Sequence, residues 1–161
     1  MAQLRLVRPQ MRTVYLVGTD HRYQRGSAFG VSSATFSEFR EELKRLISHH
    51  AIRGIAEEMS MDGLGLHRSA GGSLGFHLAA ELGLVHAYCD PSRETRRERG
   101  ITSIEQRERY WVDQLESFTG FPCLFILGAE HIKTFPPLLE QSGFRPIVSI
   151  HDWEPTSHAE V

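Results

Sequence analysis

The chain has 161 residues, of which 40% are hydrophobic and 24% are charged, and its formal net charge is -2. This composition is typical of one soluble globular domain. The slightly negative charge argues against a general nucleic-acid or membrane-surface binder, because such proteins are usually basic. No run of residues has the length of a membrane span, and we expect no signal peptide. Cys89 and Cys123 lie in apolar runs, which indicates reduced thiols and a cytoplasmic protein.

Predicted strands and helices alternate in the first third of the chain. Thr13–Gly18 is rich in β-branched and aromatic residues and predicts a buried strand. Apolar residues at helical spacing predict a helix over Thr35–His50, and Thr35 with Glu38 forms a capping-box pattern at its start. A weaker strand is expected over Ala51–Met59.

The alternation continues to the end of the chain. In chain order, the pattern predicts a loop over 60–72, a helix over 73–83, a strand over 84–90, a helix over 103–118, a strand over 122–128, a helix over 135–142 and a strand over 144–150. Thr102 and Glu105 form the second capping-box pattern. The charged segment 91–100 favours neither state, and the residues from His151 onward are expected to be frayed.

Strands that alternate with helices predict an α/β fold, with a mainly parallel sheet of about five strands and helices on both faces. This arrangement is a three-layer sandwich. We expect residues 1–152 to form a single domain and residues 153–161 to form a polar tail. The sequence leaves the order of the strands open.

Titratable side chains follow every predicted strand. In chain order they are Asp20, His21, Glu57, Glu58, Cys89, Asp90, Glu130, His131 and Asp152. Ligands of an open parallel sheet bind outside the carboxyl ends of its strands, where the loops converge. A purely structural edge would need only turn residues there. The sequence therefore predicts a functional site at this edge.

Two of these strands end in the same Gly-x-x-His step, with Gly18 before His21 and Gly128 before His131. We expect the glycines to allow a sharp turn and the close approach of a ligand to the backbone. Two imidazoles and one carboxylate from separate strands form an open site for a divalent ion such as Mn, Zn or Co. Such an ion would lower the pKa of a bound water and polarise a carbonyl or phosphoryl oxygen.

The carboxylate of this site would come from Glu57 or Glu58. If the strand continues through both residues, their side chains point in opposite directions, so only one can face the site. We favour Glu58; a simple solvated turn is the alternative for the pair.

Four segments, "VYLVGTDH", "IAEEMS", "QRERYWVDQL" and "LFILGAEHIKTFPPLLEQSGF", resemble in this order the motifs of the TraB/TIKI-like superfamily. That group is related more distantly to the ChaN and erythromycin-esterase-like proteins. The resemblance implies an α/β fold and, as in the TIKI branch, metal-dependent hydrolysis of peptide bonds. Glu108 stands where the family has Asn or Asp. The positions to which the resemblance assigns roles are His21, Glu58 (or Glu57), Arg107 and His131.

Four further features have more than one interpretation. Arg107 is either a member of a charged helix face or a group that binds a substrate carboxylate or phosphate, or orients Glu58. Asp90 is either an additional metal or hydrogen-bonding ligand or the turn acid before Pro91. Cys89 is interpreted as a small buried residue rather than a nucleophile. The arginines of 91–100 indicate a solvated segment or, alternatively, a lid that contacts phosphate.

The sequence thus predicts a metal-dependent hydrolase that acts on an ester, amide or peptide, or phosphoester bond. His21, Glu58 and His131 would hold the ion, and Arg107 and Asp90 would assist catalysis. The expected substrate is a small molecule or a peptide, with no nucleic acid or membrane involved. The alternative is a non-catalytic module that binds a small anionic ligand or a protein partner at the same edge. A second copy of the chain, in a homodimer, is a further possible partner.

Overall fold

The computed structural model describes residues 11–25, 30–66 and 71–156. Its centre is one five-stranded sheet in the order β3-β2-β4-β1-β5, and every neighbouring pair is parallel. The strands are β1 (Thr13–Thr19), β2 (Gly54–Glu57), β3 (Val85–Tyr88), β4 (Cys123–Gly128) and β5 (Arg145–Trp153). The predicted α/β fold with a parallel sheet is confirmed.

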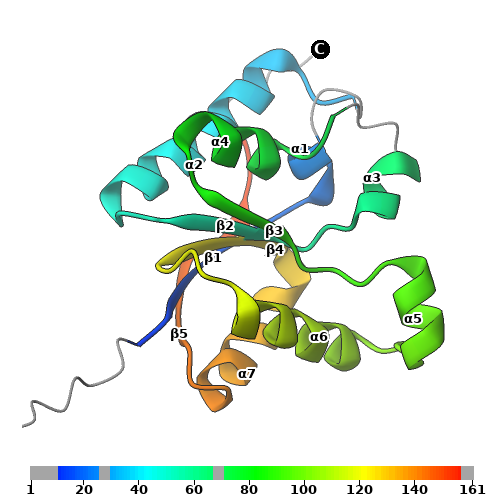
Figure 1. The fold of residues 1–161 in the computed structure, drawn as a ribbon. Helices are drawn as coiled ribbons and strands as arrows, with labels where there is room; N and C mark the ends of the chain where they lie inside the picture. Colours follow the sequence, from blue (N-terminus) through cyan, green and yellow to red (C-terminus); the bar gives the residue numbers. More distant parts are fainter. Residues whose placement is uncertain (1–10, 26–29, 67–70, 157–161) are drawn as a thin grey trace, which may run out of the picture.

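Helices cover both faces of the sheet and complete the three layers (Figure 1). One face carries α1 (His21–Arg25), α2 (Ser33–His49) and α4 (Leu74–Leu82), and the other carries α6 (Ile104–Ser117) and α7 (Phe135–Gln141). Two short helices, α3 (Met61–Leu66) and α5 (Arg93–Arg99), follow the carboxyl ends of β2 and β3. None of the helices in the described ranges is long and apolar enough to cross a membrane.

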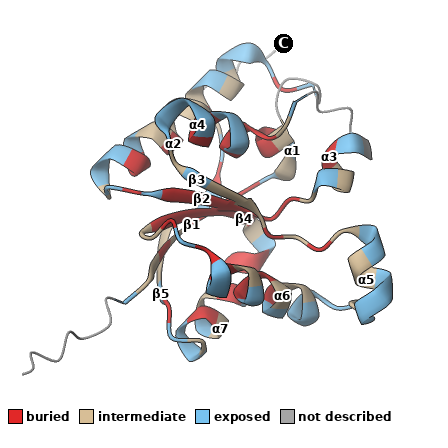
Figure 2. Ribbon diagram, viewed as in Figure 1, coloured by how far each residue is buried: buried red, intermediate tan, exposed pale blue. Residues whose placement is uncertain are grey.

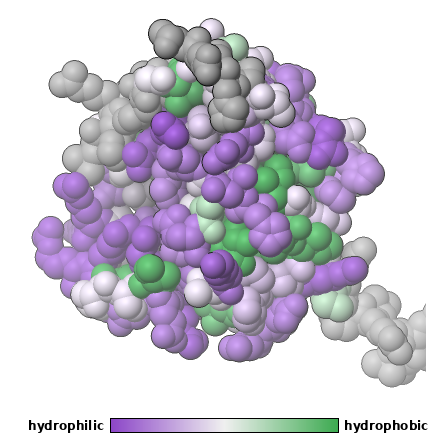
Figure 3. Space-filling view, turned by 180° about the vertical axis from the view of Figure 1, so that it is seen from behind, coloured by the Kyte–Doolittle hydropathy of each residue, from purple (hydrophilic) through white to green (hydrophobic). Residues whose placement is uncertain are grey.

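The central strands are buried because both of their faces meet apolar side chains (Figure 2). On β4, Leu124 and Ile126 pack in the cluster beneath α2 and α4, whereas Phe125 and Leu127 pack in the cluster beneath α6 and α7. Side chains alternate between the two faces of a strand, so a continuous apolar run is what a doubly covered strand requires. The face seen from behind is mostly hydrophilic, with hydrophobic side chains gathered near its centre (Figure 3).

Both predicted capping boxes are wrong in position. Helix α6 is capped by Ser103, whose side chain accepts from the Gln106 N–H, and the Gln106 side chain accepts from the Ser103 N–H. Helix α2 begins two residues earlier than predicted, because the Ser32 hydroxyl accepts from the Thr35 N–H. Ser103 directly follows the predicted cap Thr102, whereas Ser32 lies three positions before the predicted cap Thr35. Sequence spacing alone does not choose between nearby hydroxyl residues.

The predicted ends of several elements are also wrong. The second strand covers only Gly54–Glu57, and the segment predicted as the loop 60–72 contains helix α3. Strand β5 continues to Trp153, three residues beyond its predicted end. The Trp153 ring lies 4.5 Å from the Phe39 ring and 5.0 Å from the Tyr23 ring, so this residue belongs to the core and not to a polar tail.

Candidate functional site

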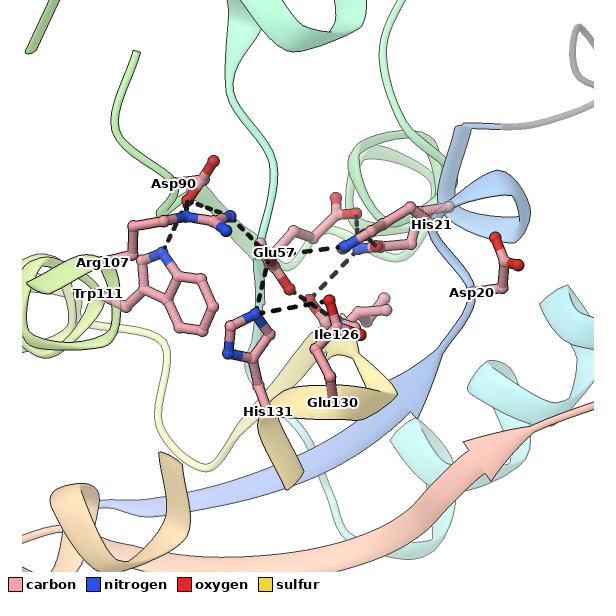
Figure 4. A network of polar contacts seen from close by, with 12 residues as sticks. Asp20, His21, Glu57, Asp90, Arg107, Trp111, Ile126, Glu130 and His131 are labelled. Carbon is pink, nitrogen blue, oxygen red and sulfur yellow. Dashed lines mark hydrogen bonds and ion pairs between the residues drawn. The ribbon is translucent and has the colours of Figure 1, made fainter. Parts of the chain in front are cut away.

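The carboxyl edge of the sheet brings together polar side chains that follow four different strands (Figure 4). His21 begins α1 directly after β1, Glu58 follows β2, Asp90 follows β3, and His131 lies in a 3-10 helix, Ala129–Ile132, after β4. His21, Glu58 and Asp90 line a cleft of about 410 Å³, and His131 contacts Glu58 from beneath. The two histidines are 110 positions apart in sequence, yet both reach the same carboxylate, as predicted.

Glu58 is the centre of the cluster. Its Oε1 atom lies 2.7 Å from Arg107 Nη2, 3.3 Å from His131 Nε2 and 3.6 Å from His21 Nε2. Its Oε2 atom accepts a 2.7 Å hydrogen bond from the Gly128 N–H. Burial raises the pKa of this carboxyl, but the His131 hydrogen bond, the nearby His21 and the Gly128 N–H outweigh it, so the pKa is lowered. Glu58 is therefore an anion at neutral pH.

His131 is held by a second buried carboxylate. Its Nδ1 atom donates to Glu108 Oε1 at 2.7 Å, and the edge of the ring meets Trp111 at 4.7 Å between ring centroids. Burial lowers the pKa of the imidazole, but the hydrogen bonds to Glu108 and Glu58 raise it to about 9. Thr134 also donates to Glu108 Oε1. Without a bound ion, His131 is an imidazolium with two carboxylate partners.

Arg107 joins Glu58 to Asp90. Its Nε and Nη2 atoms donate to Asp90 Oδ1 at 3.1 and 3.0 Å, and Trp111 Nε1 donates to the same oxygen at 3.0 Å. Arg96 pairs with the other Asp90 oxygen. Burial lowers the pKa of Arg107, but the charges of Asp90 and Glu58 raise it by more, so the net pKa is raised and the side chain is a permanent cation. Of the roles predicted for Arg107, the orientation of Glu58 is the one that these contacts support.

Glu57 points to the opposite side of β2 from Glu58 and lies outside the cleft. Its buried carboxylate accepts from Ser73 Oγ and lies 2.8 Å from His86 Nε2. Gln24 Nε2 approaches the second oxygen at 3.4 Å. The narrow preference for Glu58 over Glu57 agrees with this placement, since adjacent side chains on a strand face opposite sides.

The sharp turn predicted at the two glycines is wrong. Gly18 does not turn the chain: a β-carbon there would collide with the backbone carbonyl of His151, so glycine is needed for the close approach of β5 to β1. Gly128 is extended, with φ -60° and ψ 138°, and its N–H binds Glu58. Both residues therefore serve contacts between neighbouring segments rather than a sharp turn.

Cys89 is a buried residue and not a nucleophile in this structure. Burial and, to a smaller extent, the nearby carboxylates of Glu57 and Asp90 raise the pKa of its thiol to about 12. The neighbouring Asp90 is also more than a turn acid, since its two oxygens hold Arg107, Trp111 and Arg96.

Several residues of the site were not predicted. Gln24 lies three positions after His21, the spacing of one helical turn, but five residues were too few to predict helix α1. The sequence marks Glu108 only as a departure from the family pattern and assigns no role to Trp111. Arg93 and Arg96 line the cleft from α5. For the arginines of 91–100 the sequence offers a solvated segment or a lid that contacts phosphate, but it predicts no helix there.

The imidazoles of His21 and His131 and the carboxylate of Glu58 are side-chain types that bind divalent ions. The distances of 3.3 and 3.6 Å from Glu58 Oε1 to the two Nε2 atoms resemble the spacing of roughly 3.4 Å between ligands that surround one ion tetrahedrally at about 2.1 Å. Both rings also direct Nδ1 at an oxygen of a neighbouring side chain, as metal-binding histidines usually do. Within the described ranges, however, no group of three or more His, Cys, Asp or Glu side chains could hold an ion as it stands.

Charges of both signs line the cleft. The basic residues are His21, Arg25, Arg93, Arg96 and Arg107, and the acidic ones are Glu58, Asp62, Asp90 and Glu130. Asp90 and Glu58 are engaged by Arg107, and Asp62 accepts from the backbone N–H of Arg93. The arrangement combines a fixed anionic centre with arginines around the opening.

The chain matches none of the known protein-family models, and comparison with curated proteins and with solved structures finds no match.

Proposed function

We propose that the protein is a metal-dependent hydrolase whose site is the cleft at the carboxyl ends of β1, β2, β3 and β4. One observation carries this proposal: the Nε2 atoms of His21 and His131 lie 3.6 and 3.3 Å from a single buried oxygen, Glu58 Oε1. Two imidazole nitrogens and one carboxylate oxygen that converge from separate strands are the donor set of an open catalytic metal site. The resemblance to the TraB/TIKI-like superfamily leads to the same proposal.

His21, Glu58 and His131 would hold the ion. A divalent ion bound there supplies an activated water and polarises an oxygen of the scissile group. His131 must give up a proton before its Nε2 can act as a ligand, and Glu108 keeps the proton on Nδ1 in place. The Gly128 N–H holds the second oxygen of Glu58, so that Oε1 stays directed at the histidines.

Arginines and an exposed carboxylate would act on the substrate. Arg107 is fixed by Asp90 and can bind an anionic oxygen through its remaining N–H groups, and Arg96 lines the same cleft. Glu130 lies at the edge of the cleft, with Oε1 3.8 Å from His131 Nε2. Its exposed carboxylate can accept the proton of the attacking water. The substrate class is an anionic ester, amide or phosphoester.

Metal titration and a hydrolysis screen test the proposal. Wild-type protein, stripped with a chelator, is titrated with Mn²⁺, Zn²⁺ and Co²⁺ by calorimetry and then assayed on a carboxyl ester, a peptide and a phosphoester. We expect one ion per chain and metal-dependent turnover of one substrate class. His131→Gln and Glu58→Gln should lose both properties. His49→Gln, at an exposed position at the end of α2, is the matched control and should keep them.

A non-catalytic anion-binding module is the second candidate. It is favoured by a different observation, the permanent cation of Arg107 and the imidazolium of His131 beside a cleft with further arginines. Binding of inorganic phosphate or a small carboxylate by the stripped protein, without binding of any of the three ions, would establish this function and reject the hydrolase.

A further inference from the structure

The two histidines of the cleft are supported by different chemistry, and the support of His21 comes from Gln24. His21 begins helix α1, and Gln24 is one turn further along the same helix, with its amide fully buried. The Nδ1 atom of His21 lies 2.7 Å from Gln24 Oε1. A ring nitrogen can donate or accept, so this contact alone does not say which of the two imidazole nitrogens carries the proton.

The other end of the Gln24 amide settles its orientation. The Nε2 atom lies 3.3 Å from the carbonyl oxygen of Ile126 and 3.4 Å from Glu57 Oε2. A carbonyl oxygen can only accept hydrogen bonds, and so can a carboxylate. If the amide were turned over, its oxygen would face two acceptors and both contacts would become repulsive. Nε2 must therefore face Ile126 and Glu57, and Oε1 must face His21.

This orientation dictates the state of His21. An amide oxygen only accepts, so the hydrogen bond at 2.7 Å requires the proton to be on Nδ1 of His21. In the neutral ring the lone pair is then on Nε2, the atom that faces Glu58 and the cleft. A lone pair at Nε2 is what a metal ligand or a general base needs.

Glu57 completes the support from the far side of β2. Its carboxylate is fully buried, and Ser73 and His86 hold Oε1 while Gln24 approaches Oε2. Helix α4 passes so close that a side chain at Gly75 would collide with the Glu57 carboxylate. The carboxylate is thus confined, and it presents a fixed acceptor to the Gln24 amide.

We propose that Gln24 is a positioning residue that keeps the His21 proton on Nδ1 and directs the Nε2 lone pair into the cleft, with Glu57 fixing the orientation of the Gln24 amide. This inference deepens the proposed function, since the tautomer prepares His21 as a ligand. The tautomer itself, however, is a property of the protein without metal.

Long-range ¹H–¹⁵N correlation NMR of ¹⁵N-labelled, metal-free protein measures the tautomer, at a pH where His21 is neutral and with His21→Gln to assign its signals. Wild-type His21 should carry its proton on Nδ1. Gln24→Met removes both the acceptor and the donor, and should shift the proton towards Nε2. Gln24→Glu keeps an acceptor for Nδ1–H, and should retain the wild-type tautomer although it loses the contacts to Ile126 and Glu57. Gln141→Met, at an exposed position in α7, is the control.

Metal affinity provides a second readout. The loss of a group that orients a metal-binding histidine usually weakens metal binding about 10- to 100-fold, which is the increase in Kd expected for Gln24→Met and not for Gln141→Met. A wild-type proton on Nε2, or an unchanged tautomer in Gln24→Met, would overturn the inference. If wild-type His21 is protonated on Nδ1 but no ion binds, the positioning role stands and the hydrolase proposal fails. If Gln24→Met does not fold, the wild-type tautomer alone decides.

Discussion

The two halves of the cluster place a histidine beside Glu58 in different ways. On the β4 side, His131 is buried in a short 3-10 helix, and its partner Glu108 is an acidic side chain from α6. On the β1 side, His21 begins a five-residue helix, its side chain is 29% exposed, and its partner Gln24 is neutral. We therefore expect the buried charged pair of His131 to contribute strongly to stability, and a substitution of the partly exposed His21 to cost little stability. The His131–Glu108 side of the site would then support the fold, whereas the His21–Gln24 side would tolerate substitution.

The largest effect should come from the removal of Glu108. In Glu108→Ala the imidazolium of His131 loses its closest counterion and keeps Glu58 and the more distant, exposed Glu130, and we expect a loss of about 3–5 kcal/mol in the free energy of unfolding. Urea denaturation measures it. Glu105→Ala, an exposed glutamate one turn earlier on α6, is the control and should lie within about 0.5 kcal/mol of the wild type. A small effect at Glu108 would show that the two halves do not differ in this way.

The pH dependence of stability should follow His131. Its pKa is about 9 in the folded, metal-free protein and near its ordinary value of 6.5 when unfolded, so the folded state binds the proton more tightly. The resulting stabilisation, on the order of 3 kcal/mol, is fully present below about pH 6.5 and is lost as the pH rises through about 9. Denaturation of chelator-treated protein between pH 6 and 10 measures it, and His131→Gln should lack this slope.

An intermediate effect is expected at Gln24. The variant Gln24→Met removes a buried amide and leaves Glu57 without one of its donors, which should cost about 1–3 kcal/mol in the free energy of unfolding. Thermal and urea denaturation measure it. A loss as large as that of Glu108→Ala would mean that the neutral support of His21 matters as much to the fold as the charged support of His131.

The smallest effect should come from His21 itself. Because its side chain is partly exposed, His21→Gln should change the free energy of unfolding by less than about 1 kcal/mol, while it abolishes metal binding in the calorimetric titration. His131→Gln should lose both metal binding and stability. Equal losses of stability in the two variants would remove the distinction between the halves.

The sequence pattern was sufficient for the fold class and for the place of the site. The apolar runs that became β1 and β4, separated by amphipathic helices, predicted a parallel sheet, and a parallel sheet collects the carboxyl ends of its strands at one edge. The rule that the strand ends meet at one edge predicted that His21, Glu58, Asp90 and His131 lie close together. Element ends were predicted less well, because neighbouring hydroxyl residues offer equivalent caps and short helices such as α1 and α3 have too few residues to show a period.

The partners of the site residues became visible only in three dimensions. Arg107 and Glu58 are 49 positions apart, and the contact depends on how α6 crosses the sheet. Gln24 contacts Glu57 of β2 and Ile126 of β4, and these contacts likewise depend on how α1 packs on the sheet. Local sequence specifies which segments are strands and helices through the spacing of apolar residues, whereas hydrogen bonds between distant side chains depend on packing angles and strand order, which that spacing does not contain. Residue type and spacing therefore determined the edge and its histidines, and tertiary packing decided which atoms hold them.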